Sequence, residues 1–288
     1  LHLEKLKKER NAVILAHYYQ SQDIQDVADF MGDSLALAQQ AMTTNADIII
    51  FCGVHFMAES ADVLSGQDQK VILPDLAAGC SMADMAAPDQ LEVCWSELET
   101  MGARRVIPVT YINSAASIKA FCGERDGVVC TSSNADATLQ WAWERGDQIL
   151  FLPDQHLGRN TAYAMGVPLD QMVVWDPDVP FGGVDPEALK RARMILWKGY
   201  CSVHTKFNVE QVNSVRQRHP GVRVIVHPEC TWDVVQAADD SGSTEHIIRQ
   251  IHDSVEGSVW AVGTEVHLVS RLAETLAPDR TVLTLDPI

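Results

Sequence analysis

One pattern of strands and helices occurs three times along the chain, and this repetition constrains the fold more than any other feature of the sequence. Each copy opens with an apolar run, read as a buried strand, that ends in polar residues; these runs are residues 13–20, 106–113 and 224–230. A helical stretch and a hydroxyl-rich turn follow; the turns are residues 32–34, 131–134 and 242–244. A second buried strand comes next, at residues 48–55, 149–154 and 259–265, and a third ends near an Asp, at residues 71–75, 172–177 and 282–287. Because the repeat is domain-sized, it predicts three similar α/β units and not a solenoid.

The predicted units are residues 1–87, 88–184 and 185–288. We expect the second unit to begin with a helix at residues 88–102 and the third with a helix at residues 186–200; the Pro- and Gly-rich stretch 176–186 is the candidate joint. Strands that alternate with helices of this length favour parallel sheets. Ligands bind beyond the carboxyl ends of such strands. Three αβα units around a pseudo-threefold axis would therefore share one active site at their centre.

The chain is acidic, with a formal net charge of −17. This charge opposes binding to a nucleic-acid backbone or to an anionic membrane surface. A phosphorylated small substrate stays compatible with it, because backbone amides and hydroxyl groups can hold phosphate locally. No apolar stretch reaches the length of a membrane span. Residues 1–10 predict a charged surface helix without a signal-peptide core, and the missing initiator Met indicates that the chain begins inside its gene product.

The seven cysteines are spread singly, without a CxxC pair. Without a signal peptide, this spacing argues against a disulfide framework and predicts a reducing, cytoplasmic location. Cys80 and Cys201 lie in loops of small or turn-forming residues, where a thiolate could reach a ligand. Apolar surroundings predict buried, hydrophobe-like thiols at Cys52, Cys122 and Cys130, whereas Cys94 lies on a helical face and Cys230 is ambiguous. Spacing alone does not separate a metal ligand from a core thiol.

Polar side chains gather at the ends of the first strand of each unit. They are His17, Tyr18 and Tyr19 in the first unit, Tyr111 and Asn113 in the second, and His227 and Glu229 in the third. A single His or Tyr at a strand end is a packed residue with a satisfied polar tip in about half of cases. Three copies that each place polar groups there favour a functional site.

The hydroxyl-rich turns lie where helices should begin, at Ser34, Ser132, Ser243 and Thr244. Helix N-capping explains each of them taken alone. The same hydroxyl and amide groups could also bind phosphate or carboxylate at a helix N-terminus, and one turn can do both. The chain has no GxGxxG or Walker A motif, so a dinucleotide or ATP site has little support.

Taken together, these segments closely resemble the cluster-dependent, A-type quinolinate synthase family. The resemblance covers almost the whole chain and rests on residues 17–20, 32–34, 78–84, 111–113, 131–135, 227–230, 242–244 and 262–265. It implies a threefold pseudo-symmetric α/β fold with one [4Fe–4S] cluster at the centre. It also implies condensation of iminoaspartate with dihydroxyacetone phosphate to quinolinate, with loss of phosphate and water, in NAD biosynthesis. A functional link to L-aspartate oxidase or aspartate dehydrogenase follows from the same resemblance.

The resemblance extends to individual residues. Cys80 and Cys201 match two of the family's three cluster ligands, and the third is expected beyond Ile288. The substrate-contacting positions are matched by His17, Ser34, Tyr111, Asn113, Ser132, His227, Glu229 and Thr244, to which we add the adjacent Ser243. Three Cys ligands leave one iron open to act as a Lewis acid. We expect Glu229 to be the general base, with His227, Tyr19 and Tyr111 as the other catalytic groups.

A second class of function stays open. The same residues could form a non-catalytic α/β module that binds a phosphosugar or a dicarboxylate, with Cys80 and Cys201 merely structural. The visible absorbance of an iron–sulfur cluster in anaerobically purified protein separates the two classes.

Overall fold

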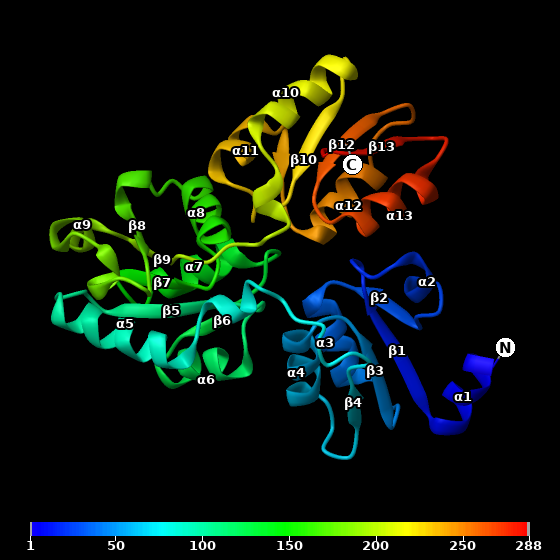
Figure 1. The fold of residues 1–288 in the computed structure, drawn as a ribbon, viewed down its shortest axis with the longest axis horizontal. Coiled ribbons are helices and arrows are strands. Elements are labelled where there is room, and N and C mark those ends of the chain that lie inside the picture. Colours follow the sequence, from blue (N-terminus) through cyan, green and yellow to red (C-terminus); the bar gives the residue numbers. More distant parts are fainter. Residues whose placement is uncertain (1, 287–288) are drawn as a thin grey trace.

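A computed structural model of the chain describes residues 2–286 and shows three α/β units around a common centre (Figure 1). Each unit is built on its own sheet, and all paired strands in the three sheets are parallel. The predicted fold class is therefore confirmed. Continuous apolar runs form the central strands because helices cover both faces of such sheets.

The first unit alternates α-helices and strands. They are α1 (His2–Arg10), β1 (Ala12–His17), α2 (Gln22–Gln25), β2 (Phe30–Gly32), α3 (Ser34–Thr43), β3 (Ile48–Cys52), α4 (His55–Leu64) and β4 (Lys70–Ile72). Its sheet has the order β2-β1-β3-β4. The expected surface helix is confirmed, since α1 buries no residue. α3 begins at Ser34 because the Asp33 carboxylate accepts a hydrogen bond from the Ala36 N–H at 2.9 Å.

The second unit has a larger sheet. Its elements are α5 (Pro88–Thr100), β5 (Val106–Tyr111), α6 (Ala116–Glu124), β6 (Val128–Cys130), α7 (Ala135–Trp143), β7 (Gln148–Leu152), α8 (Gln155–Ala164), β8 (Met172–Trp175), α9 (Pro186–Arg191) and β9 (Met194–Trp197). The strand order is β6-β5-β7-β9-β8. The helix expected at the start of this unit is confirmed by α5, in which Pro88 occupies the first turn, where a missing N–H costs nothing.

The helix expected at residues 186–200 is wrong from Ala192 onward. α9 ends at Arg191, and the next apolar run becomes β9, whose four residues are all buried between β7 and β8. Met-Ile-Leu-Trp is apolar without interruption, and this suits a strand that is covered on both faces better than a one-sided helix. β9 holds the place beside β7 that β4 holds beside β3, and β8 is an additional edge strand. Because β9 belongs to the second sheet, we propose that the second unit ends near residue 200 instead of 184.

The third unit repeats the order of the first. Its elements are α10 (Val209–Arg218), β10 (Arg223–Val226), α11 (Trp232–Ala237), β11 (Asp240–Ser241), α12 (Thr244–His252), β12 (Val259–Gly263), α13 (Val266–Leu276) and β13 (Thr281–Thr284). The sheet order is β11-β10-β12-β13. In all three sheets the first long strand and the second long strand are paired side by side: β1 with β3, β5 with β7 and β10 with β12.

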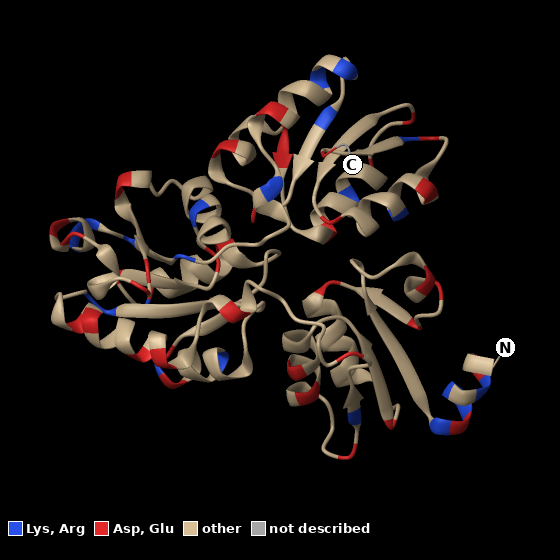
Figure 2. Cartoon of the chain, in the orientation of Figure 1, with Lys and Arg blue, Asp and Glu red and all other residues tan. Residues whose placement is uncertain are grey.

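Charge is distributed over the whole molecule. Asp and Glu residues occur on all three units, interspersed with Lys and Arg (Figure 2). Within residues 2–286, no helix combines the length and the apolar character needed to cross a bilayer.

Candidate active site

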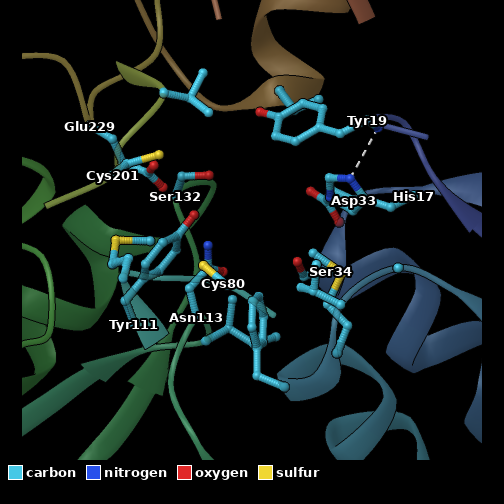
Figure 3. A pocket seen from close by; sticks show the side chains of 18 of the residues that line it. His17, Tyr19, Asp33, Ser34, Cys80, Tyr111, Asn113, Ser132, Cys201 and Glu229 are labelled. Carbon is cyan, nitrogen blue, oxygen red and sulfur yellow. Dashed lines mark hydrogen bonds between the residues drawn. The ribbon is translucent and has the colours of Figure 1, made fainter. Parts of the chain in front are cut away.

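A cavity of about 450 Å³ lies where the three units meet, and its wall is built from strand ends and the loops that follow them. The predicted residues that line it are His17, Tyr19, Ser34, Cys80, Tyr111, Asn113, Ser132, Cys201, His227, Glu229 and Thr244. Figure 3 shows His17, Tyr19 and Ser34 of the first unit on one side of this cavity, with Tyr111 and Glu229 on the other. Residues far apart in the sequence thus line one cavity.

Two residues singled out in the sequence lie elsewhere. The Ser243 hydroxyl accepts a hydrogen bond from the His246 N–H at 3.3 Å and so caps α12. Ser243 lines a second cavity, between the second and third units, which shares Ser132 with the central one. The Tyr18 hydroxyl donates to Glu245 Oε1 at 3.0 Å and connects the first unit with the third.

The first and third units hold a histidine in the same way. The Tyr19 N–H donates to His17 Nδ1 at 3.1 Å, and the Glu229 N–H donates to His227 Nδ1 at 3.3 Å. Both rings accept at Nδ1, so each neutral imidazole carries its hydrogen on Nε2. Burial lowers the pKa of His17 to about 4 and that of His227 to about 3. Both side chains are therefore neutral Nε2–H donors at neutral pH.

Glu229 is only 2% exposed and is held by imidazole groups. Its Oε2 lies 2.8 Å from His204 Nδ1, and its Oε1 lies 3.8 Å from His227 Nδ1. The rings of His204 and His227 stack, with centroids 4.5 Å apart. Burial acts to raise the pKa of Glu229, but the hydrogen bonds from the His204 ring and the Tyr111 hydroxyl favour the carboxylate and bring the pKa below its usual range. The carboxylate is thus ionised at neutral pH.

Two tyrosines face the same space. Burial raises the pKa of Tyr111 well above its usual value, and the charge of Glu229 adds to the rise. Burial likewise raises the pKa of Tyr19, whose hydroxyl lies 3.1 Å from Thr244 Oγ1 and 3.2 Å from Thr264 Oγ1. Both phenols keep their hydrogen at neutral pH and can donate it.

Cys80 and Cys201 occupy equivalent positions, since each follows the strand beside β3 or β7 and precedes a single 3-10 turn. The Ser81 hydroxyl donates to the Ser202 hydroxyl at 3.4 Å, so the two loops meet. Burial raises the pKa of the Cys80 thiol, and the N–H groups of Ala83 and Met82 oppose the rise. Burial and the charge of Glu229 raise the pKa of Cys201.

The remaining cysteines pack away from the cavity. Cys122 and Cys130 are fully buried, as expected. Cys94 and Cys230 are also buried in apolar clusters, which resolves the ambiguity at Cys230 in favour of packing. Cys52 is only half-buried, because it ends β3 at the edge of the core.

The side chains fit a metal or an iron–sulfur group. Thiols are soft ligands, and both candidate thiols line the cavity. The Sγ of Cys201 and the ligand atoms of His204 and Glu229 all lie within 4.8 Å of one another. A positive metal centre would also offset the burial that keeps these thiols protonated. The expected third cysteine ligand lies beyond Ile288, outside the described residues.

Sequence reasoning missed His204 and Thr264. His204 is 2% exposed, and its Nε2 lies 3.0 Å from Thr264 Oγ1. Thr264 directly follows β12, so the rule that drew attention to polar residues at strand ends also applied to it. His204 carried a weaker signal: it stands three residues after Cys201, in a turn and not at a strand end.

The fold and the site define a class of protein: three α/β units that share one buried site of thiols, imidazoles, phenols and a carboxylate. The family model described as "Quinolinate synthetase A protein" matches residues 2–287. The chain therefore belongs to the quinolinate synthetase A family, and the resemblance seen in its motifs is confirmed.

Individual relatives agree with the family match. A quinolinate synthase of Acidobacterium capsulatum is 57% identical over 279 residues, which cover 96% of this chain and 75% of the relative. Quinolinate synthases of Corynebacterium glutamicum and Streptomyces coelicolor are 55% and 54% identical; each alignment covers 70% of the relative and 96% or 95% of this chain.

Proposed function

We propose that this chain condenses iminoaspartate with dihydroxyacetone phosphate to form quinolinate, releasing phosphate and water, in de novo NAD biosynthesis. The observation that carries the proposal is the convergence of Glu229, Tyr111 and His227 with both candidate thiols on one cavity. Its volume of about 450 Å³ lies in the range of sites that enclose small molecules. The reaction is inferred from family membership, and the side chains of the cavity are suited to it.

Hydroxyl groups at helix starts are the proposed holders of the anionic substrate oxygens. Ser34 and Thr244 are the first residues of α3 and α12, and Ser132 lies shortly before α7. Hydroxyl and backbone N–H groups at such positions bind phosphate or carboxylate without a positive side chain. Neutral His17 and the Asn113 amide would orient the bound substrates from the first and second units. This arrangement suits anionic substrates in a chain with a net charge of −17.

Proton transfer is assigned to Glu229 and to two tyrosines of the cavity. Glu229 is the proposed general base, because it is ionised and acceptor-only in this cavity. Tyr111 and Tyr19 keep their hydrogens and are the proposed donors. His227 stands beside Glu229 and would orient the substrate or share the proton with it.

The proposed cofactor is a [4Fe–4S] cluster held by Cys80, Cys201 and a third cysteine beyond Ile288. When bound, such a group supplies a Lewis acid towards a substrate oxygen or nitrogen through an iron without a protein ligand. We further propose a cytoplasmic location and a supply of iminoaspartate by L-aspartate oxidase or aspartate dehydrogenase. Neither nucleic acid nor membrane is a proposed partner.

The test is an anaerobic assay of the full-length protein, reconstituted with iron and sulfide and given iminoaspartate and dihydroxyacetone phosphate. Formation of quinolinate, together with visible cluster absorbance, is the expected result. Tight binding of either compound without quinolinate and without a cluster would favour the non-catalytic binding module instead.

A further inference from the structure

A separate cavity of about 470 Å³ lies between the second and third units, away from the proposed active site. One wall comes from α8 and the start of β8, and the other comes from the start of α11. α8 and α11 contact each other across the boundary of the two units (Figure 1). Among the residues that the structure describes, this cavity shares no lining residue with the central one.

Arg159 brings a positive charge to this cavity. Its Nη1 donates to His156 Nδ1 at 3.3 Å, and its Nη2 donates to Gln155 Oε1 at 3.1 Å. Within residues 2–286, no Asp or Glu forms an ion pair with this guanidinium. The Asp154 carboxylate accepts instead from the backbone N–H groups of His156 and Leu157, at 3.0 and 3.1 Å. The charge of Arg159 is therefore available to a ligand.

His156 is a second donor in the same wall. A guanidinium can only donate, so His156 Nδ1 accepts from Arg159, and the neutral ring carries its hydrogen on Nε2. Burial, together with the charge of Arg159, lowers the pKa of His156 to about 4. The ring is therefore neutral at neutral pH, with an Nε2–H that can donate to a ligand.

Trp232 adds a third donor and an apolar surface. Its Nε1–H is buried and has no acceptor within residues 2–286, which is destabilising unless a bound molecule supplies one. The indole packs edge-on against Tyr163, with ring centroids 5.4 Å apart, and this contact restrains its plane. Leu169 and Met172 line the same cavity. The lining thus combines hydrogen-bond donors with apolar side chains.

The two walls of the cavity are held at a fixed separation. Asn160, the neighbour of Arg159 on α8, donates from Nδ2 to Pro228 O and to Cys230 O, each at 2.8 Å. Asn160 is 6% exposed, so these two bonds are shielded from water. Trp232 follows Cys230 by only two residues. A ligand therefore meets donors that are already positioned, and this reduces the cost of binding.

The surrounding charges select the kind of anion. Asp233 is the acidic residue that lines this cavity, at an exposed position. The charges of Asp233 and Glu229 both act against the fall in the pKa of His156, so both reach this wall. One guanidinium between two carboxylates suits a singly charged ligand better than a phosphate dianion, because like charges repel.

We propose that this cavity is a binding site for a small organic monocarboxylate. Its oxygens would accept from Arg159, His156 and Trp232, and its apolar body would lie against Leu169 and Met172. The planar guanidinium matches a carboxylate in two parallel hydrogen bonds. The inference goes beyond the proposed function and does not depend on it, because binding is measured without turnover.

Titration of benzoate into full-length, ¹⁵N-tryptophan-labelled protein tests the site. The indole N–H signal of Trp232, assigned through Trp232→Phe, should move saturably, with a dissociation constant of about 1 mM. Inorganic phosphate at the same concentrations should move this signal much less. A protein that forms no quinolinate would still give this result, so the two proposals fail separately.

Variants identify the residues that hold the carboxylate. Arg159→Gln removes the charge and should weaken benzoate binding at least about tenfold, whereas Arg159→Lys should weaken it less. Arg145→Gln is the matched control, since Arg145 stacks on Trp141 and pairs with Glu144 at the surface. Ser132→Ala should leave the Trp232 shift unchanged, because Ser132 lines the central cavity and not this one. Circular dichroism checks that each variant is folded.

Three results would overturn the inference. The first is a Trp232 signal that does not move saturably in the parent protein, which needs no variant. The second is benzoate binding by folded Arg159→Gln that equals binding by Arg145→Gln. The third is a response to inorganic phosphate as large as the response to benzoate, which would contradict the selection of a monocarboxylate.

Discussion

At the scale of single residues, the proposed function depends most on the carboxylate of Glu229, the proposed general base. A positioned general base contributes about 10²–10⁴-fold to rate. Glu229→Gln keeps the size of the side chain and removes its basicity, so we expect turnover to fall within that range while the cluster and substrate binding persist. Steady-state kinetics at matched cluster content measure the effect. Glu187→Gln is the control, because the Glu187 side chain is 68% exposed and pairs only with Lys190 on the surface.

A small loss of turnover in Glu229→Gln would contradict the role of Glu229 as general base. Turnover within a few-fold of the parent would show that Glu229 only fixes its loop. The role of base would then pass to Tyr19, Tyr111 or His227, each of which lines the cavity or its wall.

The two cavity thiols should differ sharply from a core thiol. Cys80→Ser and Cys201→Ser should each abolish cluster binding, because a serine hydroxyl replaces a soft ligand by a hard, weakly acidic one. Cys122→Ser should leave the cluster intact, since Cys122 is fully buried in the second unit's core. Analysis of iron and sulfide in anaerobically purified protein measures the cluster content. Iron and sulfide in Cys80→Ser at the levels of the parent protein would contradict the proposal that Cys80 is a cluster ligand.

Burial of His17 should make stability depend on pH. Its pKa is about 4 in the fold, and an exposed imidazole titrates near 6.5, so the unfolded chain takes up the proton first. The free energy of unfolding should therefore fall as the pH drops from about 6.5 to about 4, by about 3 kcal/mol from this residue. His17→Gln should reduce that slope in urea unfolding across the same pH range, and buried His227, whose pKa is also lowered, should account for part of what remains. His219→Gln, at an exposed position, should leave it unchanged.

At the scale of elements, β9 decides where a cysteine of the site lies. Its residue Leu196 is fully buried and pairs with Phe151 of β7, and Cys201 follows the strand closely. Leu196→Ala should destabilise the protein by about 2–5 kcal/mol, because the void in a close-packed sheet cannot collapse. Leu64→Ala should lower the free energy of unfolding far less, because the Leu64 side chain is 46% exposed. Midpoints of urea unfolding measure the stability of both variants, and equal losses of stability would contradict the burial of β9.

The sequence predicted those elements whose pattern is set locally. β1, β5 and β10 could be found because each contains an apolar run with a polar group at its end or directly after it. β9 could not, because four apolar residues after a helix read equally well as its continuation. The partners of Glu229 were hidden for a different reason. His204 is 25 residues away in sequence, so only the folded arrangement brings the two together.

At the scale of the whole molecule, the repeat predicts where a third thiolate belongs. β4 and β9 hold equivalent places in their sheets, and Cys80 and Cys201 follow them. β13 holds that place in the third unit, so the equivalent ligand should follow it, beyond Ile288. We predict that the 288-residue chain folds but retains no stable cluster, and that an extension carrying that cysteine restores both cluster and activity. Full activity of the 288-residue chain would contradict this placement.

The meeting of three strand ends at one point has a further consequence for how such a site can diversify. A homotrimer of one small unit would present the same side chain three times at its axis. Tandem fusion lifts that restriction, because each copy can mutate independently of the other two. The equivalent positions at the carboxyl end of the first long strand hold an imidazole at His17, a phenol at Tyr111 and a second imidazole at His227. A single chain with three similar units can therefore place three different side chains around a substrate that is itself not symmetric.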